Sequence, residues 1–159
     1  MIRWLALAAL LVALDQLSKY AIRQILVFGD NVEIAPFFSL VLVYNRGAAF
    51  SFLSNASGWQ RELFIAIAAV ASVWVVYLLR RHPRQTLFCL ALSLILGGAI
   101  GNVIDRLWLG AVIDFLDFHA AGYHWPAFNL ADSAITCGAA LLVWESLRGK
   151  TDGTADERG

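Results

Sequence analysis

The fold of this chain is decided by residues 85–107, which read QTLFCLALSLILGGAIGNVIDRL. The stretch has about the length that a helix needs to cross a hydrocarbon core, roughly 20 residues for about 30 Å. Three more apolar stretches of similar length lie at about 4–24, 61–79 and 127–147. The chain of 159 residues is 60% hydrophobic and only 15% charged, which excludes an ordinary soluble domain. The sequence therefore predicts an α-helical integral membrane protein with four transmembrane helices.

The first apolar stretch is predicted to be a retained helix and not a cleaved signal peptide. Arg3 precedes an apolar run from Trp4 to Leu14, but the small-x-small site that cleavage requires does not follow it. We therefore expect residues 1–148 to form a single four-helix domain. Residues 149–159 are polar and lack apolar periodicity, which predicts a disordered tail.

The basic residues near the ends of the stretches predict the orientation, because cytoplasmic loops carry an excess of Lys and Arg. If four spans alternate, one side receives most of these residues: Arg3, Arg80, Arg81, Arg84, Arg148 and Lys150. That side is predicted to be cytoplasmic, with both termini and the tail inside. Segments 28–60 and 108–126 then lie outside, so the chemistry would be extracytoplasmic.

The first outer segment predicts a small β-hairpin or sheet platform over about residues 28–58. Phe37 to Tyr44 is rich in β-branched and aromatic residues and ends at the turn signal Asn45-Arg46-Gly47, so it is predicted to be a strand. A second strand over 48–53 would pair back onto it. Such an apolar segment is either an interaction surface against the outer leaflet or a self-packed cap. Residues 112–119 allow a further short strand or a loop.

Composition argues against nucleic acid, disulfides and metal. The formal net charge is zero, so no basic surface for phosphates is expected. Cys89 and Cys137 fall inside predicted spans, where a small buried hydrophobe is the ordinary interpretation. His82, His119 and His124 do not form a ligand spacing. We expect no metal and no cofactor.

Two aspartates, Asp114 and Asp132, are the strongest candidates for chemistry. Each lies at the outer end of a hydrophobic segment, and an ionisable group near hydrocarbon is a functional hypothesis by default. Asp132 could instead serve the start of its helix, with Asn129 as the cap. Because both acids reach the same boundary, however, they can meet. Two close carboxylates share one proton and can hydrolyse a peptide by general acid–base catalysis.

Polar residues inside the spans are expected to fasten the helices. Asp15 and Lys19 stand four residues apart on one helical face and can pair; a helix clamp and a contact to substrate or headgroup stay open as alternatives. Gly97 and Gly101 form a face that allows close helix approach. Three polar residues follow at the outer end of the same span: Asn102, Asp105 and Arg106. Hydrogen bonds that hold this end together are the favoured role for Asp105 and Arg106.

Five motifs in order resemble those of bacterial lipoprotein signal peptidase, the signal peptidase II family. They are DQLSK at 15–19, NRGAAFS at 45–51, GAIGNVIDR at 98–106, VIDF at 112–115 and FNLADS at 128–133. The resemblance implies a four-helix inner-membrane aspartyl endopeptidase. It would remove the signal peptide from diacylglyceryl-modified prolipoproteins, on the N-terminal side of the lipidated cysteine, with membrane lipid as a further partner. We expect a monomer.

The resemblance also implies roles for individual residues. Asp114 and Asp132 would be the catalytic dyad. The residues that would shape or line the site are Asn45, Gly47, Asn102, Asp105, Arg106, Asn129 and Ala131. Asp15 and Lys19 match the family's first polar motif, where stability is at least as good an account as substrate contact.

Two other classes of protein compete with the peptidase. A proton-coupled transporter also uses intramembrane acids, but it requires them at several depths. Here Asp105, Asp114 and Asp132 gather at one boundary, and the deeper Asp15 is matched by Lys19. A membrane scaffold without enzymatic activity would use the same polar residues only to fasten helices.

Overall fold

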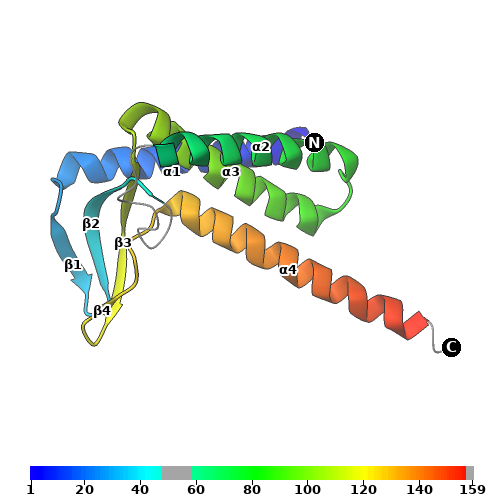
Figure 1. Cartoon of the computed structure of the whole chain (residues 1–159). Helices are drawn as coiled ribbons and strands as arrows, with labels where there is room; N and C mark the ends of the chain where they lie inside the picture. Colours follow the sequence, from blue (N-terminus) through cyan, green and yellow to red (C-terminus); the bar gives the residue numbers. More distant parts are fainter. Residues whose placement is uncertain (48–58, 157–159) are drawn as a thin grey trace.

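The structure is a computed structural model that describes residues 1–47 and 59–156, with side chains up to Arg148. Four long helices carry a small sheet at one end (Figure 1). The helices are α1 (Ile2–Ile25), α2 (Trp59–Arg81), α3 (Thr86–Leu109) and α4 (Leu130–Asp156). The strands are β1 (Asn31–Ala35), β2 (Phe38–Asn45), β3 (Val112–Ala120) and β4 (Tyr123–His124). All four helices are long and apolar enough to cross a membrane, so the predicted fold class is confirmed.

The largest departure from the predicted boundaries concerns α4. This helix begins at Leu130 and not at 127, because Asn129 adopts the capping role and places Pro126 before the helix. At its other end α4 continues to Asp156, into the segment 149–159 that was expected to be disordered. A helix that has already formed propagates at little cost, since each added residue gains one hydrogen bond.

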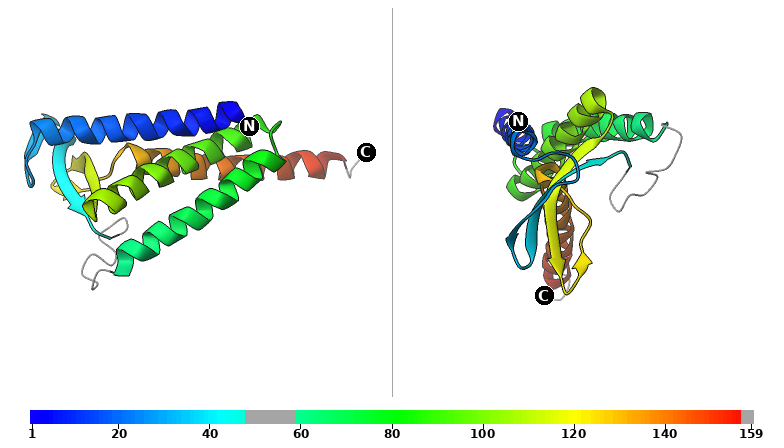
Figure 2. Two further views of the ribbon diagram at one scale, coloured as in Figure 1. Left: turned by 90° about the horizontal axis from the view of Figure 1, so that it is seen from above. Right: turned by 90° about the vertical axis from the view of Figure 1, so that its left-hand side faces the viewer.

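Helix α3 is the centre of the bundle. It packs against α1, α2 and α4, which surround it in both views of Figure 2. Glycines make these contacts close. A Cβ atom added at Gly98 would collide with the carbonyl oxygen of Ala131 in α4, and one at Gly101 would lie 2.6 Å from the carboxylate of Asp15 in α1. A Cβ atom added at Gly97 would lie 2.8 Å from the Leu11 side chain in α1, so the predicted face of Gly97 and Gly101 is a site of close helix approach, and Gly98 adds a second one toward α4.

The sheet is antiparallel, in the order β1-β2-β3-β4. Strand β2 confirms the predicted strand at residues 37–44, and β3 shows that residues 112–119 form a strand and not a loop. Strand β2 pairs with β1 on one side and β3 on the other, for example Asn31 with Val41 and Tyr44 with Ile113. The partner expected for it, residues 48–53, lies outside the described residues.

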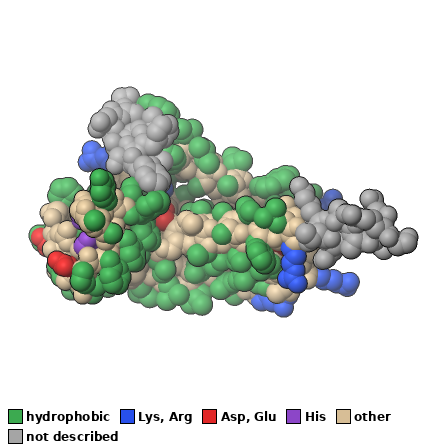
Figure 3. All heavy atoms as spheres, turned by 90° about the horizontal axis from the view of Figure 1, so that it is seen from below, with side chains coloured by type: hydrophobic (Ala, Val, Ile, Leu, Met, Phe, Trp, Pro, Cys, Tyr) green, Lys and Arg blue, Asp and Glu red, His purple; other side chains and the backbone are tan. Residues whose placement is uncertain are grey.

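Two apolar clusters hold these parts together. One, which includes Trp4, Leu79 and Leu92, joins α1, α2 and α3 at the end away from the sheet. The other, which includes Ile22 and Phe115, fixes the sheet to the end of α1. The outer faces are apolar as well, and Lys and Arg side chains gather at the end opposite the sheet (Figure 3). Apolar outer faces are what a bilayer requires.

The close approach at Gly98 generates a prediction. We expect Gly98→Ala to lower the stability of the folded protein in detergent, because the new methyl group must push α4 away, and overpacking typically costs about 1–3 kcal/mol. Alanine is by itself the better helix former, by about 1 kcal/mol, so an unchanged or raised unfolding temperature would contradict the contact. Ala140→Val, at an exposed position of α4, is the control that should leave this temperature nearly unchanged.

Candidate active site

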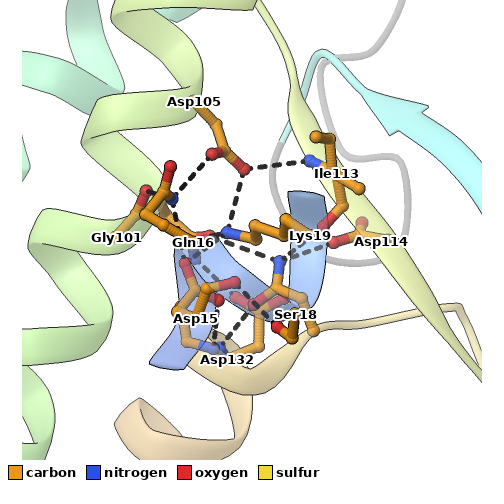
Figure 4. A network of polar contacts seen from close by, with 12 residues as sticks. Asp15, Gln16, Ser18, Lys19, Gly101, Asp105, Ile113, Asp114 and Asp132 are labelled. Atoms are coloured by element: carbon orange, nitrogen blue, oxygen red, sulfur yellow. Dashed lines mark hydrogen bonds and ion pairs between the residues drawn. The ribbon is translucent and has the colours of Figure 1, made fainter. Parts of the chain in front are cut away.

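A buried ammonium group lies at the centre of the polar network near the sheet. The Lys19 side chain is 2% exposed, and its Nζ atom lies 2.7 Å from Asp15 Oδ2 and 2.9 Å from Asp105 Oδ2. It also donates to Asn102 Oδ1 at 3.1 Å. Figure 4 shows Lys19 reaching from α1 between the two carboxylates. Since an ammonium group has three N–H donors, all of them have acceptors here.

The two carboxylates around Lys19 extend the network to the start of α4 and to β3. Asp15 Oδ1 accepts a hydrogen bond from the Ala131 backbone N–H at 3.0 Å. Asp105 Oδ2 accepts one from the Ile113 N–H at 3.1 Å. The Gln16 amide donates to Asp105 Oδ1 at 2.9 Å. One charge cluster thus connects α1, α3, α4 and β3, which is the arrangement that the clamp alternative for Asp15 and Lys19 requires.

Asn102 transmits this arrangement to Asp132. Its oxygen accepts from Lys19 and, at 3.2 Å, from the Asn129 amide. The oxygen end of the amide is therefore fixed, and the NH₂ end is directed at Asp132, to whose Oδ1 it donates at 2.8 Å. A flipped amide would place two donors against the Lys19 ammonium. The orientation of Asn102 follows from the position of a charge in a different helix.

Asn129 has a similar double role at the start of α4. Its Oδ1 accepts the Asp132 N–H at 2.9 Å, which is a typical N-cap bond. Its Nδ2 donates to Asp114 Oδ1 at 2.8 Å. The cap residue therefore also holds the second aspartate, and Asp132 itself lies in the first turn, where the helix dipole favours a negative charge.

Asp114 is placed by β3 and is almost completely buried, with 2% exposure. Asn45, at the end of the neighbouring strand β2, donates to its Oδ2 at 3.0 Å. Burial raises the pKa of Asp114 to about 7, and the nearby charge of Asp132 adds to the increase. The hydrogen bonds from Asn45 and Asn129 act in the opposite direction but are smaller effects. At neutral pH a substantial share of Asp114 keeps its proton.

Both aspartates line a pocket of about 520 Å³ between the sheet, α3 and α4. Asn45, Gly47, Asn102 and Arg106 line it as well. The pocket continues along α4 past its first turn, where the lining residues are Ser133, Ile135, Thr136 and Cys137. The site is thus open to the part of the molecule that crosses the membrane.

The guanidinium of Arg106 lies 5.1 Å from the ring centre of Phe64 in α2 and interacts electrostatically with both Asp114 and Asp132. Its Nη2 atom donates to the Gly47 carbonyl at 3.3 Å. This contact connects α3 to the residues that directly follow β2. Arg106 therefore supplies positive potential beside the carboxylates while its hydrogen bonds go to carbonyl groups.

The structure separates the predicted site residues into two groups. Those that line the pocket are Asn45, Gly47, Asn102, Arg106, Asp114 and Asp132. Those that lie behind it, in the buried network, are Asp15, Lys19, Asp105, Asn129 and Ala131. In the pocket wall, sequence reasoning missed Ser133, Thr136 and Cys137. The helical repeat that continues from Asp132 is the signal that could have indicated them.

Four helices long and apolar enough to cross a membrane, with two aspartates in one pocket at an end of the bundle, are the features expected of a multi-pass membrane enzyme. The sequence matches the family Signal peptidase (SPase) II over residues 7–148. The chain therefore belongs to the signal peptidase II family, and is accordingly a protease, which confirms the resemblance of the motifs. With four spans and this family, it is a bacterial inner-membrane protein.

Relatives and solved structures agree with this assignment. A lipoprotein signal peptidase of Paraburkholderia phymatum is 62% identical over 145 residues, which cover 91% of this chain and 87% of the relative. A lipoprotein signal peptidase of Janthinobacterium sp. (strain Marseille) is 56% identical over 148 residues, which cover 93% of this chain and 90% of the relative. A solved structure described as a bacterial membrane enzyme has a TM-score of 0.86 at 32% identity, covering 96% of this chain and 92% of that one.

The charge cluster predicts the effect of removing its cation. We expect Lys19→Met to destabilise the protein strongly, by about 3–5 kcal/mol, because the buried carboxylates of Asp15 and Asp105 would face each other without a counter-charge. Arg23→Met, one turn further along α1 at an exposed position, is the matched control. Unfolding in detergent, followed by circular dichroism, measures both. Equal stability of the two variants would show that the cluster does not hold the fold.

Proposed function

We propose that this chain is a lipoprotein signal peptidase that works as an aspartyl endopeptidase, with Asp114 and Asp132 as its catalytic dyad. Its substrate is a diacylglyceryl-modified prolipoprotein, cut on the N-terminal side of the lipidated cysteine. The relatives that match over most of their length carry the name of this activity. The observation on which the proposal rests is the meeting of the two carboxylates, one from β3 and one from α4, in a single pocket.

The dyad differs from the other acids of the network in its partners. Asp15 and Asp105 each have a direct ion pair with Lys19, so their carboxyl groups take part in the contacts that hold the helices together. The hydrogen bonds to the side chains of Asp114 and Asp132 come from the neutral amides of Asn45, Asn102 and Asn129. Neutral donors hold a carboxyl group in place in either protonation state of the pair.

Asp114 is the acid of the pair and Asp132 the base. The pKa of Asp114, raised to about 7 by burial and by Asp132, favours a resting proton on this residue. Asp132 accepts a hydrogen bond from the Asn102 amide in the first turn of α4, and as the partner of the protonated residue it takes the role of base. Placing the proton on one member relieves the repulsion between two close carboxylates, as in aspartic proteases generally.

The reaction needs no group beyond this pair and a water molecule. The oxygen of the water molecule attacks the scissile carbonyl carbon while Asp132 takes a proton from this water. Asp114 gives its own proton to the carbonyl oxygen, and the product of this step is a tetrahedral diol. Asp132 then passes its proton to the leaving nitrogen, and Asp114 recovers one from a hydroxyl as the C–N bond breaks. The amine of the lipidated cysteine leaves, and the dyad returns to its starting protonation.

The substrate reaches the pocket from the bilayer. Thr136 and Cys137 are exposed and lie within the spanning part of α4, so the pocket opens laterally. The sheet adds exposed apolar side chains at the same end of the bundle, among them Ile34, Phe37 and Phe118. These side chains rest in the outer leaflet and support the diacylglyceryl chains. Both aspartates and the asparagines that hold them come from one chain, so we expect the enzyme to act as a monomer.

The orientation follows from the basic residues. The end of the bundle opposite the sheet carries Arg3, Arg80, Arg81 and Arg84, all of them exposed. Positive residues of this kind remain in the cytoplasm. Both termini are therefore cytoplasmic, and the pocket lies at the extracytoplasmic face, where a prolipoprotein is exported.

The first test is cleavage of a diacylglyceryl-modified prolipoprotein by the purified protein in detergent. We expect Asp114→Asn and Asp132→Asn each to lower turnover by at least about a thousandfold, because either change removes the acid or the base. Glu33→Gln, at an exposed position of β1, should retain full activity. A chelator should leave the wild type unaffected.

Each variant is compared at equal folded concentration, confirmed by its unfolding temperature. Full turnover by either aspartate variant would remove that residue from the dyad. An inactive but well-folded wild type, together with proton flux in vesicles, would favour the transporter instead.

The second test is the pH dependence of the same reaction. Because Asp114 must hold a proton, kcat/KM is expected to fall as the pH rises through about 7. Because the pKa of Asp114 is higher in the folded protein than in the unfolded chain, ionising this residue disfavours the fold. The contribution of Asp114 to the free energy of unfolding is therefore lost as the pH rises from the ordinary pKa of an aspartate to about 7. Unfolding temperatures recorded at each pH separate the two effects. A rate that stays constant well above this pH would assign the proton elsewhere.

A further inference from the structure

A second and larger cavity lies away from the dyad. It is a groove of about 790 Å³ between α1, α2 and α3, with Ala9 and Val12 on one wall, Val73 and Val76 on the other and Leu96 in its floor. Its lining is almost entirely apolar. It lies within the spanning parts of all three helices, toward the end of the bundle opposite the sheet. In Figure 2 the first two helices flank the third at this end.

The end of the groove is marked by positive charge. Arg80 lines the groove in the last turn of α2, and Tyr77 lies one turn before it. The neighbouring Arg81 donates to the Tyr77 hydroxyl at 3.1 Å. An apolar channel in the membrane that ends at a cation matches a molecule with a long hydrocarbon part and an anionic head.

Charge also argues against two other occupants. The signal peptide of a substrate carries a positively charged segment before its apolar core, and this segment would face the arginines. A second copy of the chain in the same orientation would place its own Arg80 and Arg81 at the same depth, and like charges repel. Both occupants bring positive charge to a place that favours negative charge.

We propose that this groove is a binding site for an anionic phospholipid of the leaflet on the arginine side, which is the cytoplasmic leaflet in the orientation given above. An acyl chain lies between α1 and α2, over α3, and the phosphate meets the Arg80 guanidinium. The site is independent of the dyad. It gives α2 a further packing partner along the groove that this helix shares with α1.

The test measures lipid retained by the whole purified protein. Protein equilibrated in mixed micelles of phosphatidylglycerol and phosphatidylcholine, present in equal amounts, is examined by native mass spectrometry. The wild type is expected to retain phosphatidylglycerol preferentially. Arg80→Gln should reduce this preference by about fivefold, the effect of one basic residue near an anionic membrane surface. Arg84→Gln, exposed and outside the groove, should change it far less.

A second pair of variants tests the apolar part of the groove. Ala9→Phe fills it from an exposed position on α1 and should lower the retention of both lipids, whereas Ala6→Phe, exposed on the same helix but outside the lining, should not. Peptidase activity at saturating substrate checks that each variant is folded. Equal retention of the two lipids by the wild type, equal effects of the two arginine variants, or unchanged retention by Ala9→Phe would each overturn the proposal. So would displacement of the lipid by a synthetic signal peptide.

Discussion

The rest of the structure depends on the burial of one ammonium group. A charge in a membrane protein is tolerated only where partners replace the water it has lost. Lys19 obtains them from α1 and α3, as the carboxylates of Asp15 and Asp105 and the amide oxygen of Asn102. The same carboxylates accept backbone N–H groups at the start of α4 and of β3. The requirement of a single charge thereby fixes the relative positions of three helices and the sheet.

The arrangement of the proposed dyad follows from this clamp. With its oxygen held by Lys19, Asn102 can present only its NH₂ group to Asp132. Asn129 is fixed by its cap bond to α4 and presents its NH₂ group to Asp114. The two aspartates are thus oriented by amides whose own orientation is set outside the pocket. Hydrogen bonds of this kind, made by residues outside the pocket, fix the orientation of the groups inside it.

Sequence reasoning predicted the helices, and it singled out the two aspartates that line one pocket, because both features depend on local signals. Apolar length locates the spans, and an acid such as Asp114 is conspicuous in an apolar segment. The partner of β2 was beyond reach, since pairing between β2 and β3 joins segments on either side of two helices. The sequence alone also could not indicate that Lys19 has partners on α3. An i,i+4 pair predicts the contact with Asp15, but the contact with Asp105 depends on how two helices pack.

The balance of charge in the network favours a proton on one of the two pocket aspartates. Within the polar network that joins Lys19 to the pocket, the side chains of Asp15, Asp105, Asp114 and Asp132 lie near two cations, Lys19 and Arg106. The ammonium group is bound to the two structural acids, and the hydrogen bonds of the guanidinium go to backbone carbonyls. Ionising all four acids would leave two negative charges uncompensated, and a proton on buried Asp114 halves that excess. The clamp that holds the pocket together therefore also keeps the ammonium group paired with Asp15 and Asp105, which favours the role of proton donor that we propose for Asp114.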